Sequence, residues 1–223
     1  MKAAAIIVAG GDGKRFGSQT SKQFLTLCGK PVFMHSIEAF LSVKAFNQII
    51  LAVPKYLSDV LSKKYKNYDF TITAGGKERF DSVKNSMAFL KGAIEFVAVH
   101  DAVRPLICAE DIILVLKAAK KYGAAIAAEK AKDTIKISEN GFVKSTLDRN
   151  ILWNAQTPQI FKAALFKKIY SGKIPKDVTD DSMLAEKAGH KIAIVETRSP
   201  NFKITIKQDF LFAKQLLSSR CRR

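Results

Sequence analysis

Glycines and cations gather near the start of the chain, directly after an apolar run that is typical of a buried strand. The run at residues 3–8 ends at the loop AGGDGKRFG of residues 9–17, and Lys22 follows a few residues later. Glycines allow backbone N–H groups to approach an anion closely, and Arg15 and Lys22 supply positive charge. The pattern predicts a site for a phosphorylated ligand, with a nucleotide as the first hypothesis and an ordinary strand-to-helix turn as the alternative.

Two familiar phosphate-binding motifs do not fit this loop. The P-loop string GxxxxGK[ST] does not occur, and the dinucleotide pattern G-x-G-x-x-G would need a glycine where the chain has Phe16. The acidic residue expected after a second strand is also missing, because residues 49–53 run into Pro54 and Lys55. A cationic loop of this kind suits the triphosphate of a nucleotide donor better than NAD.

Two further polar loops follow apolar runs, AGGKERFDS at residues 74–82 and HDAVRP at residues 100–105. The carboxyl ends of parallel strands meet at one edge of an open α/β sheet, and ligands bind there. Asp101 is therefore placed to hold Mg²⁺ against phosphate oxygens, with a helix cap or turn as the alternative. We interpret His100 as a packing or hydrogen-bonding residue rather than a general base.

The elements that must position these loops are predicted from hydrophobic periodicity. Apolar runs alternate with amphipathic segments, which is typical of a parallel sheet flanked by helices, so we expect an α/β fold. The expected strands are residues 3–8, 49–53, 70–74, 95–99, 124–129, 191–196 and 202–206. The expected helices are residues 31–43, 56–65, 82–90, 109–123, 163–172, 181–189 and 208–217.

One segment interrupts this alternation. The dipeptide Asn140-Gly141 lies between two alternating runs at residues 134–138 and 142–147, which is a strong hairpin signal. We expect a β-arm at about residues 132–153 that projects from the sheet. The sequence shows no internal repeat and no linker, so we expect one domain over residues 1–223 with this arm.

Composition limits the class of protein further. The 223 residues are 48% hydrophobic, and no apolar run approaches the roughly 20 residues that a membrane span needs. The predicted first strand begins within a few residues of the N-terminus, so we expect no signal peptide and no membrane association. Three scattered cysteines without metal-ligand spacing indicate a reducing compartment, and we expect a cytoplasmic protein.

The formal net charge of +17 raises the question of nucleic-acid binding. The lysines are spread along the whole chain and match no RNA- or DNA-binding motif, so attraction for anionic small molecules is favoured over nucleic acid. A nucleotide- or RNA-binding protein without catalysis stays open as an alternative from another class.

Seven motifs in order carry a resemblance to a known family: AGGDGKRFG with SKQFL, GGKERFDSV, HDAVRP, DTIK, DRNILWNAQTPQIF, TDDSMLAEKAG and NFKIT. From about residue 5 to residue 210 the chain resembles the 2-C-methyl-D-erythritol 4-phosphate cytidylyltransferases. The resemblance implies a Rossmann-like nucleotidyltransferase fold and a homodimer whose β-arm helps to build the acceptor site. It also implies transfer of a cytidylyl group from CTP to 2-C-methyl-D-erythritol 4-phosphate, a sugar-alcohol phosphate, with Mg²⁺ or another divalent cation, in isoprenoid precursor biosynthesis.

The resemblance also implies residue roles. The residues implied to be catalytic are Arg15, Lys22, Arg149 and Lys203. The residues implied to bind the nucleotide are Ala9, Gly10, Gly11, Gly13, Gly76, Lys77, Ser82, Asp101 and Ala102, with Asp101 also the metal ligand. The residues implied to line the acceptor pocket are Arg104, Thr134, Thr157 and Thr179.

These roles suit a reaction in which the nucleophile is already an ionised phosphate oxygen. No general base is needed, and the difficulty is to bring two anions together, so positioning and positive charge supply most of the catalysis. The sequence departs from the family's usual pattern at Gly10, at Ser21 and at Val103. The glycine pair and the valine also occur in ribitol 5-phosphate cytidylyltransferases, which remain an alternative, whereas DTIK, DRNILW and TDDSMLAE favour the methylerythritol enzyme.

Overall fold

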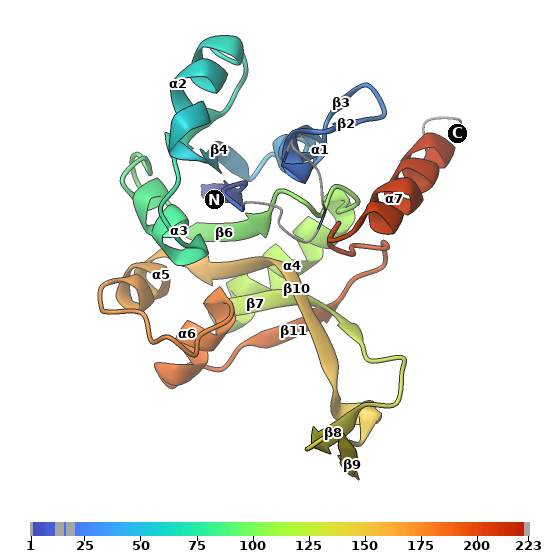
Figure 1. Ribbon diagram of the computed structural model, residues 1–223. Coiled ribbons are helices and arrows are strands. Elements are labelled where there is room, and N and C mark those ends of the chain that lie inside the picture. Colours follow the sequence, from blue (N-terminus) through green and yellow to red (C-terminus); the bar gives the residue numbers. More distant parts are fainter. Residues whose placement is uncertain (1, 12–15, 17–20, 221–223) are drawn as a thin grey trace.

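A mixed, mostly parallel sheet forms the centre of the molecule (Figure 1). The computed structural model describes residues 2–11, 16 and 21–220. Within these residues seven strands pair in the order β11-β7-β10-β6-β1-β4-β5. Their bounds are β1 Ala3–Val8, β4 Phe46–Val53, β5 Thr71–Ala74, β6 Phe96–Asp101, β7 Ala124–Lys130, β10 Trp153–Lys162 and β11 Ala193–Glu196. The predicted α/β class with a mostly parallel sheet is confirmed.

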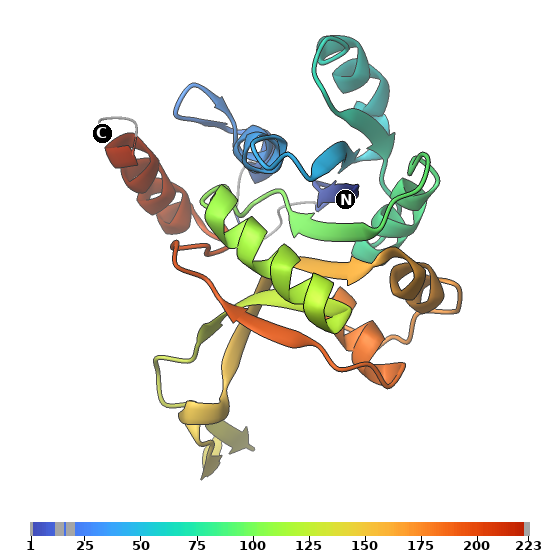
Figure 2. The same cartoon turned by 180° about the vertical axis from the view of Figure 1, so that it is seen from behind.

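Helices cover both faces of this sheet, as the two views show (Figure 2). Their bounds are α1 Val32–Leu41, α2 Lys55–Lys64, α3 Arg79–Met87, α4 Ala109–Tyr122, α5 Ala163–Tyr170, α6 Asp181–Lys187 and α7 Lys207–Arg220. Short elements complete the fold: η2 Lys22–Phe24, β2 Thr26–Leu27, β3 Lys30–Pro31 and η3 Arg149–Ile151. Among the described residues, no helix has the length and apolar character to cross a membrane.

Strand β1 shows why the sheet needs helices on both sides. Ala5 and Ile7 pack into one hydrophobic cluster with α1 and α4, whereas Ile6 packs into another with α3, α5 and α6. Alternate side chains of a strand point to opposite faces, so a strand that is apolar at every position must be buried on both. The apolar run that opens the sequence thus becomes an inner strand, and its end lies at the carboxyl edge of the sheet.

The predicted arm is confirmed as a hairpin that projects from the sheet (Figures 1 and 2). Strands β8 (Lys136–Glu139) and β9 (Phe142–Thr146) pair antiparallel, and every residue in them is exposed. Asn140 and Gly141 take positive φ values of 53° and 84°. A two-residue hairpin turn of type I′ needs both positions in this region, which explains the Asn-Gly pair.

The prediction of a strand at residues 202–206 was wrong. Phe202, Ile204 and Ile206 alternate as in a strand, but the segment pairs with no sheet strand; Ile204 N donates one hydrogen bond to Val103 O at 2.8 Å. Ile204 is buried in a cluster with Leu106, so its apolar side chain serves packing beside α7 and not a ladder. The segment crosses the carboxyl edge of the sheet on its way from β11 to α7.

Strand β10 was missed by the sequence analysis. Its polar residues and Pro158 argue against a strand, because proline cannot donate to a ladder. In the structure β10 runs antiparallel between β6 and β7, and its pairing with β7 shifts register between Ala155 and Gln159. Pro158 lies inside this irregularity, where its missing N–H costs no ladder bond.

Candidate active site

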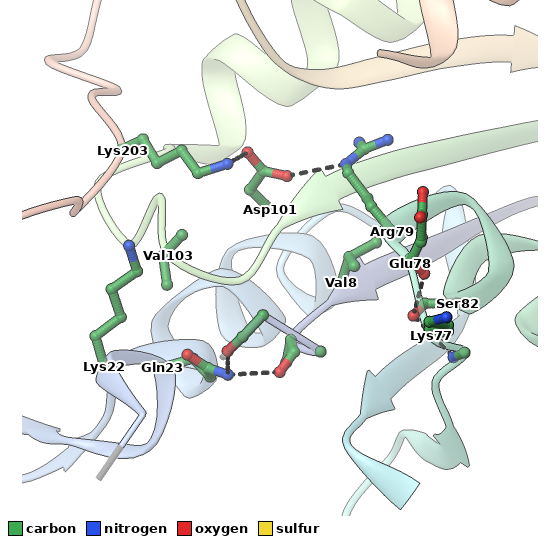
Figure 3. Close-up of a pocket in the computed structure, with 14 residues that line it drawn as sticks. Val8, Lys22, Gln23, Lys77, Glu78, Arg79, Ser82, Asp101, Val103 and Lys203 are labelled. Carbon is green, nitrogen blue, oxygen red and sulfur yellow. Dashed lines mark hydrogen bonds and ion pairs between the residues drawn. The ribbon is translucent and has the colours of Figure 1, made fainter. Parts of the chain in front are cut away.

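A pocket of about 430 Å³ opens at the carboxyl edge of the sheet (Figure 3). It lies between the end of β1, the start of α3, the end of β6 and the segment before α7. The predicted residues that line it are Ala9, Gly10, Gly11, Lys22, Gly76, Lys77, Ser82, Asp101 and Lys203. Three separate loops therefore converge on one cavity, as expected from the sheet topology.

Asp101 lies at the centre of the charged groups in this pocket. Lys203 Nζ is 2.9 Å from Oδ2, Arg79 Nε is 3.5 Å from Oδ1, and Arg104 Nε is 3.6 Å from Oδ2. Burial alone would raise the pKa of Asp101, but Arg79, Lys203 and Arg104 together hold it well below its usual range. The carboxylate is ionised, and its charge is balanced by cations from three parts of the chain.

Lys203 reaches Asp101 because the segment before it is fixed to β10. Asn201 is buried, and its Nδ2 donates to Gln156 Oε1 at 3.0 Å and to Thr157 O at 2.7 Å. Arg104 Nη1 in turn donates to Asn201 O at 2.8 Å. The irregular part of β10 thus accepts the hydrogen bonds that bring Lys203 over the pocket.

Arg79 is a residue that the sequence analysis missed, although the loop AGGKERFDS contained it. Its Nη2 donates to Asp181 Oδ2 at 2.7 Å, while its Nε faces Asp101. Burial lowers the pKa of Arg79, but Asp181 and Asp101 more than offset this and hold it above its ordinary value. Tyr170 donates its hydroxyl to Asp181 Oδ1, so the pocket is tied to α5 and α6.

A buried hydrogen-bond chain fixes the backbone at the end of β6. Asp101 N donates to Thr157 Oγ1 at 3.0 Å, and Thr157 Oγ1 lies 3.0 Å from His100 Nδ1. Burial lowers the pKa of His100 to about 4, and Asp101 offsets this only in part. The neutral imidazole accepts a hydrogen bond from the Thr157 hydroxyl at Nδ1. Its Nε2 donates a hydrogen bond to Arg104 O at 3.3 Å. His100 is fully buried and does not line the pocket.

The second glycine loop is held against α3 by Ser82. Gly76 N donates to Ser82 Oγ at 3.0 Å, and that hydroxyl donates to Glu78 O at 3.1 Å. A Cβ on Gly76 would lie 2.0 Å from Asp81 Cβ, so no larger residue fits there without moving the backbone. The loop can pack closely against α3 because this position has no side chain.

Several predicted site residues lie elsewhere. Gly13 and Arg15 lie outside the described residues. Ala102 is buried, and its N–H donates to Val8 O; Arg104 and Thr157 are buried behind Asp101 and do not line the pocket. Thr134 and Arg149 are exposed at the arm, where Arg149 Nη1 donates to Lys132 O at 3.1 Å, and Thr179 is exposed just before α6.

Asp101 and Glu78 are the pocket carboxylates that would hold a metal ion together with a bound phosphate. Among the described residues no group of three His, Cys, Asp or Glu side chains could hold a metal by itself. Asp101 and Glu78 both line the pocket, and Mg²⁺ is commonly held by one or two carboxylates together with substrate phosphates. The donor set therefore suits a cation that arrives with a nucleotide.

A mostly parallel α/β sheet that gathers glycine loops, lysines and an ionised aspartate at its carboxyl edge is the arrangement expected of a Rossmann-like enzyme that acts on nucleotide phosphates. The sequence model of the 2-C-methyl-D-erythritol 4-phosphate cytidylyltransferase family matches residues 3–219 of this chain. The chain belongs to this family. It is thus a transferase, and the resemblance found in the sequence is confirmed.

Members of this family are similar in sequence to nearly the whole of this chain. The 2-C-methyl-D-erythritol 4-phosphate cytidylyltransferase of Endomicrobium trichonymphae is 57% identical over 98% of this chain and 100% of its own. That of Clostridium botulinum is 40% identical over 96% and 99%. The crystal structure of 4-diphosphocytidyl-2C-methyl-D-erythritol synthase from Anaerococcus prevotii matches with a TM-score of 0.84 at 29% identity, covering 97% of this chain and 96% of that one.

Proposed function

We propose that this enzyme transfers a cytidylyl group from CTP to 2-C-methyl-D-erythritol 4-phosphate in isoprenoid precursor biosynthesis. The products are 4-diphosphocytidyl-2-C-methyl-D-erythritol and pyrophosphate. The observation that carries the proposal is the convergence of Lys22, Lys203 and ionised Asp101 between two glycine loops, in a chain of this family.

The reaction joins two anions, and the pocket supplies the charges that this requires. An oxygen of the acceptor phosphate forms a bond to the α-phosphorus of CTP while the bond to the bridging oxygen breaks and pyrophosphate leaves. Lys22 and Lys203 lower the repulsion between the reacting phosphates, and Arg15 is proposed to act with Lys22 on the transition state. The backbone of the two glycine loops binds the triphosphate and the cytidine.

Divalent cations and the partner subunit complete the proposal. Asp101 would hold Mg²⁺, which when bound neutralises phosphate charge on the donor. The arm would join two subunits and bring Arg149 and Thr134 to the acceptor site of the partner. Its exposed apolar residues support this, since Phe142 is 78% and Val143 65% exposed in the single chain. A cytoplasmic location stays a prediction.

Pyrophosphate release with CTP and Mg²⁺ tests the function, with methylerythritol phosphate and ribitol 5-phosphate supplied in parallel. We expect release with methylerythritol phosphate. Selective release with ribitol phosphate would make the chain a ribitol 5-phosphate cytidylyltransferase, and no release with either would favour a non-catalytic binding protein. Lys22→Ala should lower turnover by roughly 10²–10³, by analogy with the loss of a transition-state donor. Lys117→Ala on the exposed face of α4 is the matched control.

A further inference from the structure

We propose that Gln23 is a positioning residue that sets the orientation of residues 9–11, the described start of the first glycine loop, for binding phosphate. The inference deepens the proposed function, because it concerns the donor side of the same pocket. Gln23 follows Lys22 in the short helix η2 (Lys22–Phe24), and its side chain is buried, with 2% of the residue exposed.

The side-chain amide of Gln23 binds two carbonyl oxygens of the loop at once. Its Nε2 donates to Ala9 O at 2.7 Å and to Gly11 O at 2.9 Å (Figure 3). The amide nitrogen has two protons, and these two bonds use both. We call these two hydrogen bonds from Gln23 the clamp. Ala9 N donates to Ala52 O at 2.8 Å, so the clamp begins at the residue where the pairing of β1 with β4 ends.

These two hydrogen bonds determine whether carbonyl oxygens or N–H groups of the loop face a bound anion. Carbonyl oxygens carry partial negative charge and would repel a phosphate, but those of Ala9 and Gly11 are turned onto Gln23. In a trans peptide the carbonyl and the next N–H point in opposite directions, so the N–H of Gly10 is turned away from Gln23. Gly10 and Gly11 both line the pocket, so a Gly10 N–H held in this way is available to phosphate oxygens.

Two substitutions of Gln23 remove the donated hydrogen bonds in different ways. Gln23→Glu keeps the size of the side chain but replaces the donor by a carboxylate that repels both carbonyl oxygens. Gln23→Met keeps most of the volume and removes the two bonds without adding charge. Gln48 offers a matched control, because its Nε2 donates to Lys91 O at 2.5 Å and its Oε1 accepts from Lys91 N at 2.9 Å, near the start of β4 and outside the pocket lining.

The test uses the full chain in buffer with Mg²⁺ and measures binding of CTP, pyrophosphate and cytidine by calorimetry. We expect Gln23→Glu to weaken CTP and pyrophosphate by at least about tenfold, the size expected from lost or reversed hydrogen bonds. Cytidine binding should not change, the KM for the acceptor should stay within about twofold, and Gln48→Glu should bind all ligands as the wild type does.

Three results would overturn the inference. One is a folded Gln23→Glu that binds pyrophosphate as tightly as Gln48→Glu does. Another is an equal loss of cytidine and pyrophosphate affinity, since that indicates a collapsed pocket. If Gln23→Glu does not fold, a folded Gln23→Met with unchanged pyrophosphate affinity has the same meaning. A wild type that binds CTP but releases no pyrophosphate with any acceptor contradicts the proposed function and leaves this binding test valid.

Discussion

Lys203 Nζ lies 2.9 Å from Asp101 Oδ2, although 102 residues separate them in the chain. Asp101 ends the buried strand β6, and Lys203 comes from a segment without regular structure that crosses the edge of the sheet. The lysine is 40% exposed at its side chain, whereas the carboxylate is 11% exposed. The pair therefore places a partly exposed cation over a buried carboxylate in the pocket.

Replacing Lys203 should impair catalysis more than folding. Lys203→Met removes one of the cations that bring the two phosphates together, so we expect turnover to fall by roughly 10²–10³. Asp101 keeps Arg79 and Arg104 as ionic partners, so the melting temperature should change little. Pyrophosphate release and thermal melting measure the two effects, with Lys117→Met as control. Turnover equal to that of the control would contradict the role of Lys203.

Arg79 and Asp181 should be coupled in stability. Arg79→Met leaves the Asp181 carboxylate, which has no exposed side-chain surface, without its cation, and we expect a loss of about 3–5 kcal/mol in the free energy of unfolding. Asp181→Asn combined with Arg79→Met should lose less than the sum of the single variants. Chemical denaturation of the four proteins gives the coupling energy. Purely additive losses would show that the pair does not act as a unit.

Stability should fall with decreasing pH because of His100. Its pKa is about 4 in the folded chain and near 6.5 when unfolded, so the unfolded state binds more protons between these values. The contribution is complete above pH 6.5 and is lost as the pH falls towards 4, at up to about 1.4 kcal/mol per pH unit. His100→Asn keeps an acceptor for Thr157 but does not titrate. Denaturation curves from pH 7 to pH 4 should therefore be flatter for this variant than for the wild type, and parallel profiles would contradict the assignment.

The second glycine loop should not tolerate a side chain at Gly76. A Cβ there would meet Asp81 Cβ at 2.0 Å and Asp81 C at 2.9 Å, so Gly76→Ala must displace the loop from α3. We expect CTP affinity to fall by about tenfold or more, the size expected from a lost set of backbone hydrogen bonds. Gly172→Ala is the control, since no described atom beyond its own chain neighbours lies within 4 Å of its Cβ position. Calorimetric titration with CTP compares them, and equal affinities would refute the steric argument.

Local sequence patterns predicted many of the helices and strands correctly. The strands at residues 3–8 and 95–99, the helix at residues 109–123 and the Asn140-Gly141 hairpin were all predicted from periodicity and turn chemistry, and the structure has them. These signals act between near neighbours in sequence. Strand β10 was missed because its stabilising partners β6 and β7 come from elsewhere in the chain, and residues 202–206 were assigned a strand because alternation alone does not show what a segment packs against.

Residue types and their spacing were enough to predict the glycine loops, the aspartate at the end of β6, the arm and the family to which the chain belongs. Folding alone brings the cations to Asp101, lets Arg79 bridge it to Asp181, and places the amide of Gln23 on the carbonyls of Ala9 and Gly11. Residue types and turns are local properties, whereas an ion pair or a clamp exists only when folding brings polar atoms of separate segments within about 3 Å of one another.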